Sequence, residues 1–151
     1  MLNTKAATDA RHARAGKDAM LYNSAGQAFA QAESYTSSAS FNNFTYAPLG
    51  QNRELEVNNT VGVKLTLSEL VVLDGELFNA VIDAIANGES PVLSMTGVIQ
   101  GRNGSEERIV YNECIFSGDQ DIQNVSTGDV LKRGYSLHCN GTVKQQSKLT
   151  I

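Results

Sequence analysis

Residues 60–73 read TVGVKLTLSELVVL, and residues 76–87, which follow two positions later, read ELFNAVIDAIAN. In the first stretch apolar residues alternate with polar or small ones, which is the period of a half-buried β-strand. In the second stretch apolar residues recur every three or four positions, which is the period of an amphipathic helix. This change of period predicts a strand followed by a helix.

The predicted helix, at about residues 75–87, has signals at both ends. Asp74 is a suitable N-cap, and Asn87-Gly88 is typical of a helix C-terminus. Its apolar stripe is more typical of a surface that faces a core than of a groove for a partner. The residues expected to pack against the sheet are Leu77, Phe78, Val81, Ile82 and Ile85.

Strand patterns continue after the helix. Residues 92–100 and 108–116 flank a Gly/Asn-rich turn and predict a β-hairpin. Residues 120–126 predict a short polar strand, and residues 130–140 alternate as a further strand. The two short turns between these segments contain Gly and Asp, as turns often do.

Strand patterns also precede residue 60. Residues 18–22 and 27–36 flank an Asn/Ser/Gly turn and predict an early hairpin. Residues 40–48 are rich in aromatic residues and predict a third strand, whose aromatic side chains we expect in a core or an interface. These are Phe41, Phe44 and Tyr46. Residues 49–59 are polar and fit either a long loop or an extended excursion.

The pattern as a whole predicts a mainly β protein. Seven or eight strands with closely spaced turns and one helix are typical of an antiparallel β-sandwich or a barrel-like fold with one flanking helix. The 151 residues and 16.2 kDa suit a single domain, residues 1–151. Within it we expect a polar N-terminal arm at about residues 1–14 and a basic C-terminal tail at about residues 141–151.

Charge is low and unevenly placed. Charged residues make up 19% of the chain, and Ser, Thr, Asn and Gln together number 44. Residues 1–17 carry a net charge of +3, residues 18–131 of −11, and residues 132–151 of +4. An acidic body argues against wrapping nucleic acid, which needs a concentrated basic face. Basic ends on an acidic body permit attraction between copies, although two solvated tails would look the same.

The sequence lacks the patterns of an enzyme or a metal site. It has two histidines, His12 and His138, and no phosphate loop, nucleophile elbow or metal-type cysteine spacing. Cys139 follows His138 directly, so on a strand the two side chains point to opposite faces and do not form a nucleophile–base pair. Cys114 and Cys139 fit small buried hydrophobes. We therefore expect no catalytic residue, no cofactor and no metal.

No apolar run approaches the about 18 residues of a membrane span, and the N-terminus has no apolar core typical of a secretory signal. From these two observations we expect neither a transmembrane helix nor a signal peptide.

The helix and the strands after it resemble a known family. LFNAVI at residues 77–82, NGESP at residues 87–91, ERIVY at residues 107–111 and CIF at residues 114–116 follow one another as in the tail tube proteins of contractile phage tails, of the type found in PBSX-like prophages and phage-tail-like bacteriocins. The residue-level likeness lies in residues 75–118, and the order of elements extends it over nearly the whole chain.

This resemblance implies a structural role. Hexameric rings would stack into a hollow tube that conducts DNA or ions and is driven through the host envelope when a sheath contracts. Its partners would be further copies, a contractile sheath protein, and tape measure and baseplate proteins, in a virion tail or tail-like particle made in the bacterial cytoplasm. DNA would pass through the lumen only in a true phage.

Three segments are hypothetical contacts between subunits or rings in such a tube. They are the polar arm, the excursion at residues 49–60 and the basic C-terminal segment. Their charged residues are Arg11, Arg14, Arg53, Glu54, Glu56, Lys144 and Lys148. The alternative function is a β-sandwich module that binds a receptor or a carbohydrate. The lack of Trp makes that alternative weaker, because such modules usually expose clustered aromatic residues.

Overall fold

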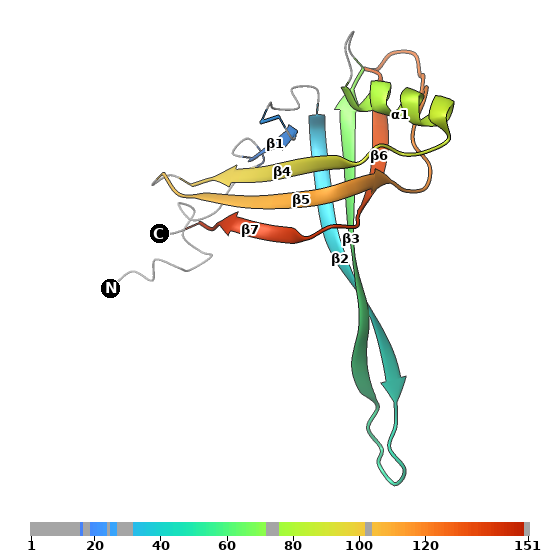
Figure 1. The fold of residues 1–151 in the computed structure, drawn as a ribbon, viewed down its shortest axis with the longest axis vertical. Coiled ribbons are helices and arrows are strands. Elements are labelled where there is room, and N and C mark those ends of the chain that lie inside the picture. The colour runs from blue at the N-terminus through green and yellow to red at the C-terminus, as the bar shows by residue number, and fades with distance from the viewer. Residues whose placement is uncertain are drawn as a thin grey trace.

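The computed structural model describes residues 16, 19–23, 25–26, 32–71, 76–101 and 104–149. These residues form one helix and seven strands (Figure 1), namely β1 (Ala19–Asn23), β2 (Ala32–Tyr46), β3 (Leu55–Leu70), α1 (Glu76–Asn87), β4 (Leu93–Gln100), β5 (Glu106–Phe116), β6 (Lys132–Cys139) and β7 (Val143–Ser147). All pairings are antiparallel, in the order β1-β4-β5-β6-β3-β2, with β7 beside β5. The prediction of a mainly β antiparallel fold with one flanking helix is confirmed.

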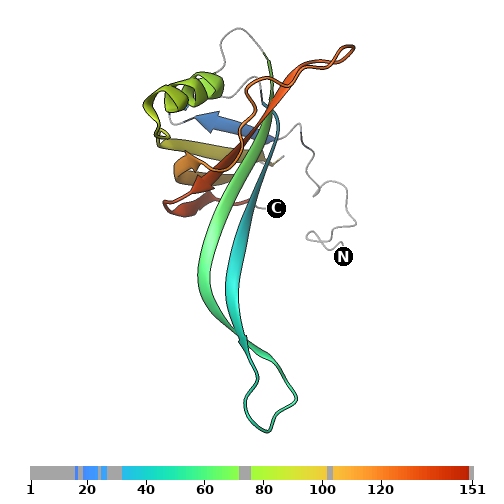
Figure 2. The same ribbon diagram turned by 90° about the vertical axis from the view of Figure 1, so that its right-hand side faces the viewer.

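The sheet folds back on itself as two crossed halves. β1, β4, β5 and β7 run across the molecule, whereas β2, β3 and β6 run along its length (Figures 1 and 2). The halves join where β5 pairs with β6 over three residue pairs, from Cys114↔Cys139 to Phe116↔Leu137. Such a bend lets one continuous sheet cover both sides of a single core.

The bend coincides with a bulge in β5. Glu113 has φ 53°, and the pairing of β5 with β4 shifts by one residue between Leu93 and Met95. A residue in this left-handed conformation is typical of a bulge, which turns a strand and increases its twist. Across from the bulge, Gly141 lies so close to Asn112 that a Cβ would meet the Asn112 carbonyl oxygen at 2.8 Å. Only glycine fits at this corner.

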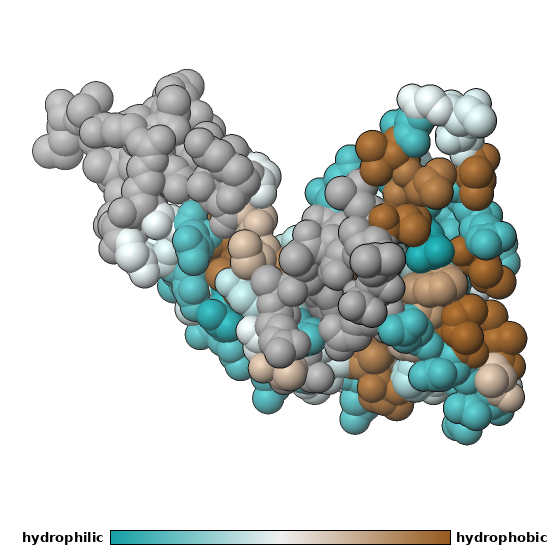
Figure 3. Space-filling view, turned by 90° about the horizontal axis from the view of Figure 1, so that it is seen from above, coloured by the Kyte–Doolittle hydropathy of each residue, from teal (hydrophilic) through white to brown (hydrophobic). Residues whose placement is uncertain are grey.

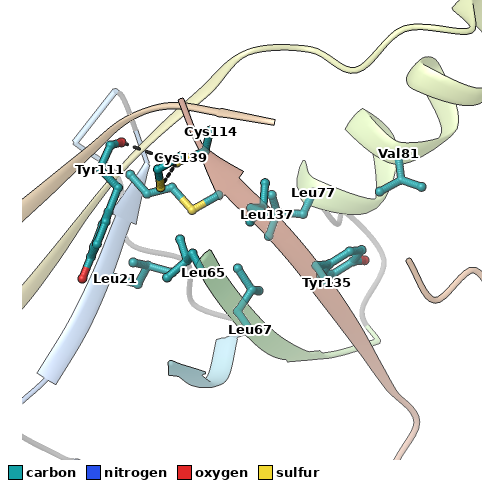
Figure 4. Packing of buried hydrophobic residues seen from close by; sticks show 11 residues of the cluster. Leu21, Leu65, Leu67, Leu77, Val81, Tyr111, Cys114, Tyr135, Leu137 and Cys139 are labelled. Carbon is teal, nitrogen blue, oxygen red and sulfur yellow. Dashed lines mark hydrogen bonds between the residues drawn. The ribbon is translucent and has the colours of Figure 1, made fainter. Parts of the chain in front are cut away.

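The core lies between the two halves. Leu65 and Leu67 of β3 face Leu137 and Tyr135 of β6, and all four side chains are buried. Figure 4 shows these four side chains together with core residues of β1, β5 and α1. The remaining members of the cluster are Leu21, Leu77, Val81, Met95, Tyr111, Cys114 and Cys139. The alternation that predicted the strand at residues 60–73 therefore arises from this buried face.

The helix prediction is confirmed, with α1 ending at Asn87 and a positive φ of 70° at Gly88. Leu77 and Val81 lie in the core. Ile82 and Ile85, expected to pack against the sheet, are instead 42% and 60% exposed. Only the side of the helix that carries Leu77 and Val81 reaches the core, because the other side extends past the strands.

Phe78 is only partly covered by the sheet. The Arg133 guanidinium lies 3.7 Å from the centre of its ring, in a cation–π contact from β6. Asp74, the expected N-cap, lies outside the described residues.

Three strand predictions differ from the structure. Residues 32–46, expected to belong to two separate strands, form the single strand β2. β1 pairs with β4, a partner that the sequence did not predict, and the Asn23–Gly26 turn is present with its 3.1 Å backbone hydrogen bond, so the early hairpin itself stays a prediction. Residues 27–31 of that hairpin lie outside the described residues. Residues 120–126 form no strand. Residues 143–147, expected in a tail, form β7 against β5.

Residues 120–121 lie along β6 instead. The Ser136 backbone N–H donates to the Gln120 side chain at 2.7 Å, and the Gly134 N–H donates to the Asp121 carboxylate at 2.9 Å. These two side chains take the place of a neighbouring strand and protect part of the β6 edge.

Candidate functional site

The projecting hairpin of β2 and β3 is the most conspicuous feature of the molecule. The two strands extend far beyond the body that contains the core (Figures 1 and 2). At their far end the Gln51 backbone N–H donates to the Pro48 carbonyl at 3.1 Å, and Gly50 has φ 84°. This is the geometry of a type II turn, which needs glycine at its third position. Leu49, at the tip, is fully exposed.

The base of the hairpin is fixed to the body by two tyrosines. The Ser37 hydroxyl on β2 lies 2.7 Å from the Tyr111 hydroxyl on β5. The Tyr35 hydroxyl lies against Gly97 of β4, where a Cβ would meet it at 2.8 Å. These contacts tie β2 to the opposite half of the sheet and set the direction in which the hairpin leaves the body.

Apolar side chains change face along the hairpin. Near the body they continue the core face, so that Phe41 pairs with Val61, and these side chains are 61% and 58% exposed. The register then shifts by one residue between Asn42 and Asn43, which leaves Asn59 of β3 unpaired as a bulge. Because β2 continues its alternation, residues three positions apart on it point to opposite sides.

Beyond the bulge, the pairs Phe44↔Val57 and Tyr46↔Leu55 therefore present their apolar side chains on the other side. We call these four residues the distal apolar face. Phe44 is 65% exposed, and Val57 and Tyr46 are each 49% exposed. Exposed aromatic and β-branched residues paired in this way are unusual on a surface that stays in water.

The side of β2, β3 and β6 that faces away from the core carries mostly small polar residues. Thr36, Thr66 and Ser136 lie in one row across the three strands, and Ser38, Lys64 and His138 lie in the next. Ser40, Gly62, Asn42 and Thr60 continue it along the hairpin. We call these ten residues the hydroxyl face. Lys64 is the one permanently charged side chain among them.

Long strand edges are unpaired in the described part of the sheet. β2 is the last strand in the sheet order, so its outer edge has no neighbour. β6 covers β3 only from Val63 to Leu70, which leaves residues 55–62 open on the side away from β2. Long open edges are sites for pairing with another chain.

The predicted contact residues fall at several places. Arg53, Glu54 and Glu56 are exposed at the tip of the hairpin, where Glu56 accepts a 3.1 Å hydrogen bond from the Asn43 side chain. Lys144 and Lys148 are exposed on or just after β7, away from that tip. Arg11 and Arg14 lie outside the described residues. The structure thus brings together only the three residues of the hairpin.

A second apolar surface lies at the other end of the molecule. Ile82 and Ile85 of α1 are exposed, as are Ile122, Val125 and Val130 of the segment that connects β5 to β6. We call these five residues the α1 patch. Seen from above, hydrophobic side chains gather on the side of the molecule where α1 lies (Figure 3). The α1 patch and the hairpin tip lie at opposite ends of the long axis (Figure 1).

One carboxylate lies in the core. Glu69 is 3% exposed and accepts a 2.9 Å hydrogen bond from the Tyr135 hydroxyl. Burial raises the pKa of Glu69 above its ordinary value, although the bond from Tyr135 and the nearby Arg133 act in the opposite direction. The hydrogen bond from Tyr135 gives the buried carboxylate of Glu69 the partner that a buried polar group needs.

Metal-ligating residues do not gather among the described residues. His138 and Cys139 lie on opposite sides of β6, as expected from their adjacency. Within the ranges described above, no helix is long and apolar enough to cross a membrane.

No protein-family model matches the sequence, and no curated protein is significantly similar to it. Solved structures do match. A chain of the PVC extracellular contractile injection system, from its sheath–tube complex in the extended state, is similar with TM-score 0.68 at 12% identity, covering 96% of this chain and 100% of that chain. A chain from the tube-terminating cap of the anti-feeding prophage is similar with TM-score 0.69 at 12% identity, covering 98% and 100%.

The SPP1 tail tube is also similar, with TM-score 0.67 at 12% identity, and the match covers 91% of this chain and 81% of that chain. The chain has the tail tube fold. The resemblance found in residues 75–118 is therefore confirmed at the level of the fold.

Within this tail tube fold, the sequence did carry a signal for the change of apolar face. Phe41 and Phe44 are three residues apart on β2, whereas Val61 and Val57 are four apart on β3. Pairing both sets requires one extra residue on β3, which is the bulge at Asn59. The hydroxyl face had a weaker signal, because the small residues of residues 36–42 and 60–66 also fit a shallow core.

Proposed function

We propose that this chain is the structural subunit of a tail tube, in which copies form rings and the rings stack. The observation that carries the proposal is the hairpin, with two open edges, an outer side rich in hydroxyl groups and exposed apolar pairs, on a tail tube fold. A lone subunit gains nothing from such a surface, because open edges and apolar patches promote association.

Within a ring, the open edge of β2 would pair with residues 55–62 of β3 in the next copy. The two strands run antiparallel under this arrangement, as in the hairpin itself. A head-to-tail contact of this kind generates a closed ring when its rotation closes. Similar chains occur in a baseplate described as 6-fold symmetrised and in a tail with C6 symmetry, so we propose hexameric rings.

The hydroxyl face would then line the channel, with the body of each subunit outside it. The body lies on the core side of β2 and β3, opposite to the hydroxyl face. A wall of Ser, Thr and Asn with Lys64 as its one permanent charge offers few phosphate contacts, and affinity for DNA rises with each such contact. DNA or ions would pass along this wall without being held.

Between rings, the distal apolar face would contact the α1 patch, with the twist of the hairpin turning its tip away from the channel that the hydroxyl face lines. The two surfaces lie at opposite ends of the long axis, so stacking copies along this axis brings them together. Both surfaces are apolar, and their burial supplies a favourable free energy of about 25 cal/mol per Å². The charged residues Arg53, Glu54 and Glu56 would surround this contact.

The remaining hypotheses concern the ends and the outer layer. The N-terminal arm with Arg11 and Arg14, and the basic residues Lys144 and Lys148, would meet acidic surfaces of neighbouring copies. A contractile sheath protein would surround the tube, while tape measure and baseplate proteins would contact its inside and its end. A subunit that only assembles with copies of itself and with these partners needs no catalytic group, and the sequence contains no pattern typical of one.

Negative-stain electron microscopy of the purified protein tests this proposal. The wild-type protein should form rings or rods, whereas the variants Phe44→Asp and Ile85→Asp should form isolated rings that do not stack. Met20→Asp, which places the same charge on an exposed β1 residue outside every proposed contact, should stack normally. A wild-type protein that stays monomeric at high concentration would favour the binding-module alternative and contradict the proposal.

A further inference from the structure

The two cysteines of the chain meet at the bend of the sheet. The Sγ atoms of Cys114 on β5 and Cys139 on β6 lie 3.0 Å apart, and both side chains are buried. Figure 4 shows them side by side in the core. The Cys114 thiol has one further partner, the Tyr111 carbonyl oxygen at 3.7 Å. Both cysteines are present as free thiols.

The backbone around these two residues suits a bond between them. Cys114 and Cys139 are direct partners in the antiparallel pairing of β5 with β6. The Asn140 N–H donates to the Glu113 carbonyl at 3.0 Å, which places the cysteines at a non-hydrogen-bonded pair. At such a pair the Cα atoms lie about 4.5 Å apart, which is within the range that disulfides span.

A bond at this place would connect the two halves of the sheet. β5 and β6 pair over three residues only, and this short stretch joins the half of the sheet that carries the hairpin to the other half. A covalent link at Cys114 and Cys139 would keep β6 on β5 when the hydrogen bonds of that stretch open. It would therefore hold the projecting hairpin to the body.

We propose that Cys114 and Cys139 are a disulfide-forming pair that closes the bend of the sheet under oxidising conditions. With a low-molecular-weight disulfide such as oxidised glutathione, one protein thiolate attacks that disulfide and releases one glutathione thiolate. The second protein thiolate attacks the protein sulfur of the mixed disulfide and releases the second glutathione. The two cysteines lose two electrons and two protons in total, and the oxidant gains them.

Burial sets the rate of this reaction. Burial raises the pKa of Cys114, and the neighbouring Cys139 thiol raises it further. Since the thiolate is the reacting form, the folded protein with closed strands reacts slowly. Reaction requires β6 to move away from β5, so the bond should form readily during folding and slowly in the folded subunit.

The test compares folding and folded protein, and it does not depend on the proposed function. The full chain is refolded from urea with oxidised glutathione, or with a reducing agent, while a third sample is folded first and then exposed to oxidised glutathione. We expect refolding with oxidised glutathione to give an intramolecular disulfide. Mass spectrometry should show a mass lower by two hydrogen atoms, and a thiol assay should find neither free thiol. The folded sample should react at least tenfold more slowly.

The bonded form should also be more stable. A bond that closes the segment between Cys114 and Cys139 should raise the Tm by about 10 °C over the reduced form. The control is Cys139→Ser, which keeps one thiol and should yield only the glutathione adduct. Two free thiols after refolding with oxidised glutathione, or a wild-type protein that carries only glutathione adducts, would overturn the proposal, as would a bonded form with a lower Tm.

Discussion

The hydroxyl groups of Ser37 and Tyr111 lie 2.7 Å apart and join the base of the projecting hairpin to the opposite half of the sheet. The two residues are 74 positions apart in the chain. Tyr111 is buried in the core, so its hydroxyl is held in place. This contact fixes the direction of the hairpin relative to the body, on which the proposed pairing between copies depends.

A double-mutant cycle measures the contribution of this contact. Ser37→Ala and Tyr111→Phe each remove one hydroxyl, and each should lower the free energy of unfolding by about 1 kcal/mol. The double variant should lose about as much as one single variant, because the second change removes no further bond. Urea unfolding checks this, and fully additive losses would show that the hydroxyls do not interact.

Truncating a buried leucine should lower the stability far more than truncating an exposed one. Leu65→Ala should cost about 2–5 kcal/mol, because Leu65 is fully buried and its loss leaves a cavity. Leu49→Ala is the matched change at the exposed hairpin tip, and it should leave the free energy of unfolding within about 0.5 kcal/mol of wild type. Equal losses from both variants would place Leu65 outside the core.

The bulge at Glu113 predicts that glycine is tolerated at this position and that valine is not. Glu113 has φ 53°, a conformation that costs a side-chain-bearing residue about 1 kcal/mol and costs glycine nothing. Glu113→Gly should therefore keep or raise the Tm, whereas Glu113→Val should lower it, because a β-branched residue fits this conformation poorly. Thermal unfolding of the two variants decides the matter, and a higher Tm for the valine variant would contradict the bulge.

The buried carboxylate predicts a dependence on pH. Because the pKa of Glu69 is raised by burial, the folded state binds its proton more tightly than the unfolded state does. Its contribution to stability is thus greatest below the unfolded pKa and is lost as the pH rises through the folded pKa. Glu69→Gln keeps an acceptor for Tyr135 and removes this loss.

The Tm of Glu69→Gln relative to wild type should therefore increase as the pH rises from about 4 to 8. Thermal unfolding of both proteins across that range measures the difference. The control is Glu54→Gln, which makes the same change at an exposed position. A change at Gln120 would not serve, because the Gln120 side chain hydrogen-bonds to β6. A difference between Glu69→Gln and wild type that stays constant with pH would show that the pKa of Glu69 is not raised.

Local sequence patterns were sufficient to predict the helix and most strands of the fold. The helix and the β4–β5 hairpin follow from periodicity and turn residues within about 40 positions of chain, and both predictions are confirmed. The partner of β1 could not be predicted this way. Nothing in the Asn23–Gly26 turn indicates that β1 pairs with β4, which is more than 70 positions away. Alternation shows that a segment is a strand and does not show which strand lies beside it.

The candidate site was harder to predict for the same reason. The apolar stripe of α1 fits a core-facing helix, yet Ile82 and Ile85 lie beyond the area that the sheet covers. The sequence alone does not show how much of α1 the sheet covers, because this depends on how the two halves of the sheet cross. Likewise, Gln120 and Asp121 alternate as in a strand, and the structure uses their side chains to occupy the β6 edge.

We propose that the β2–β3 hairpins of neighbouring copies form the wall of a channel. Cryo-electron microscopy of the particles formed by the purified protein tests this arrangement. We expect stacked rings in which the hydroxyl face, with Ser38 and Lys64, lines a central channel and each hairpin tip reaches the α1 patch of the next ring. Particles whose hairpins lie on the outer surface, or a protein that forms no rings, would contradict it.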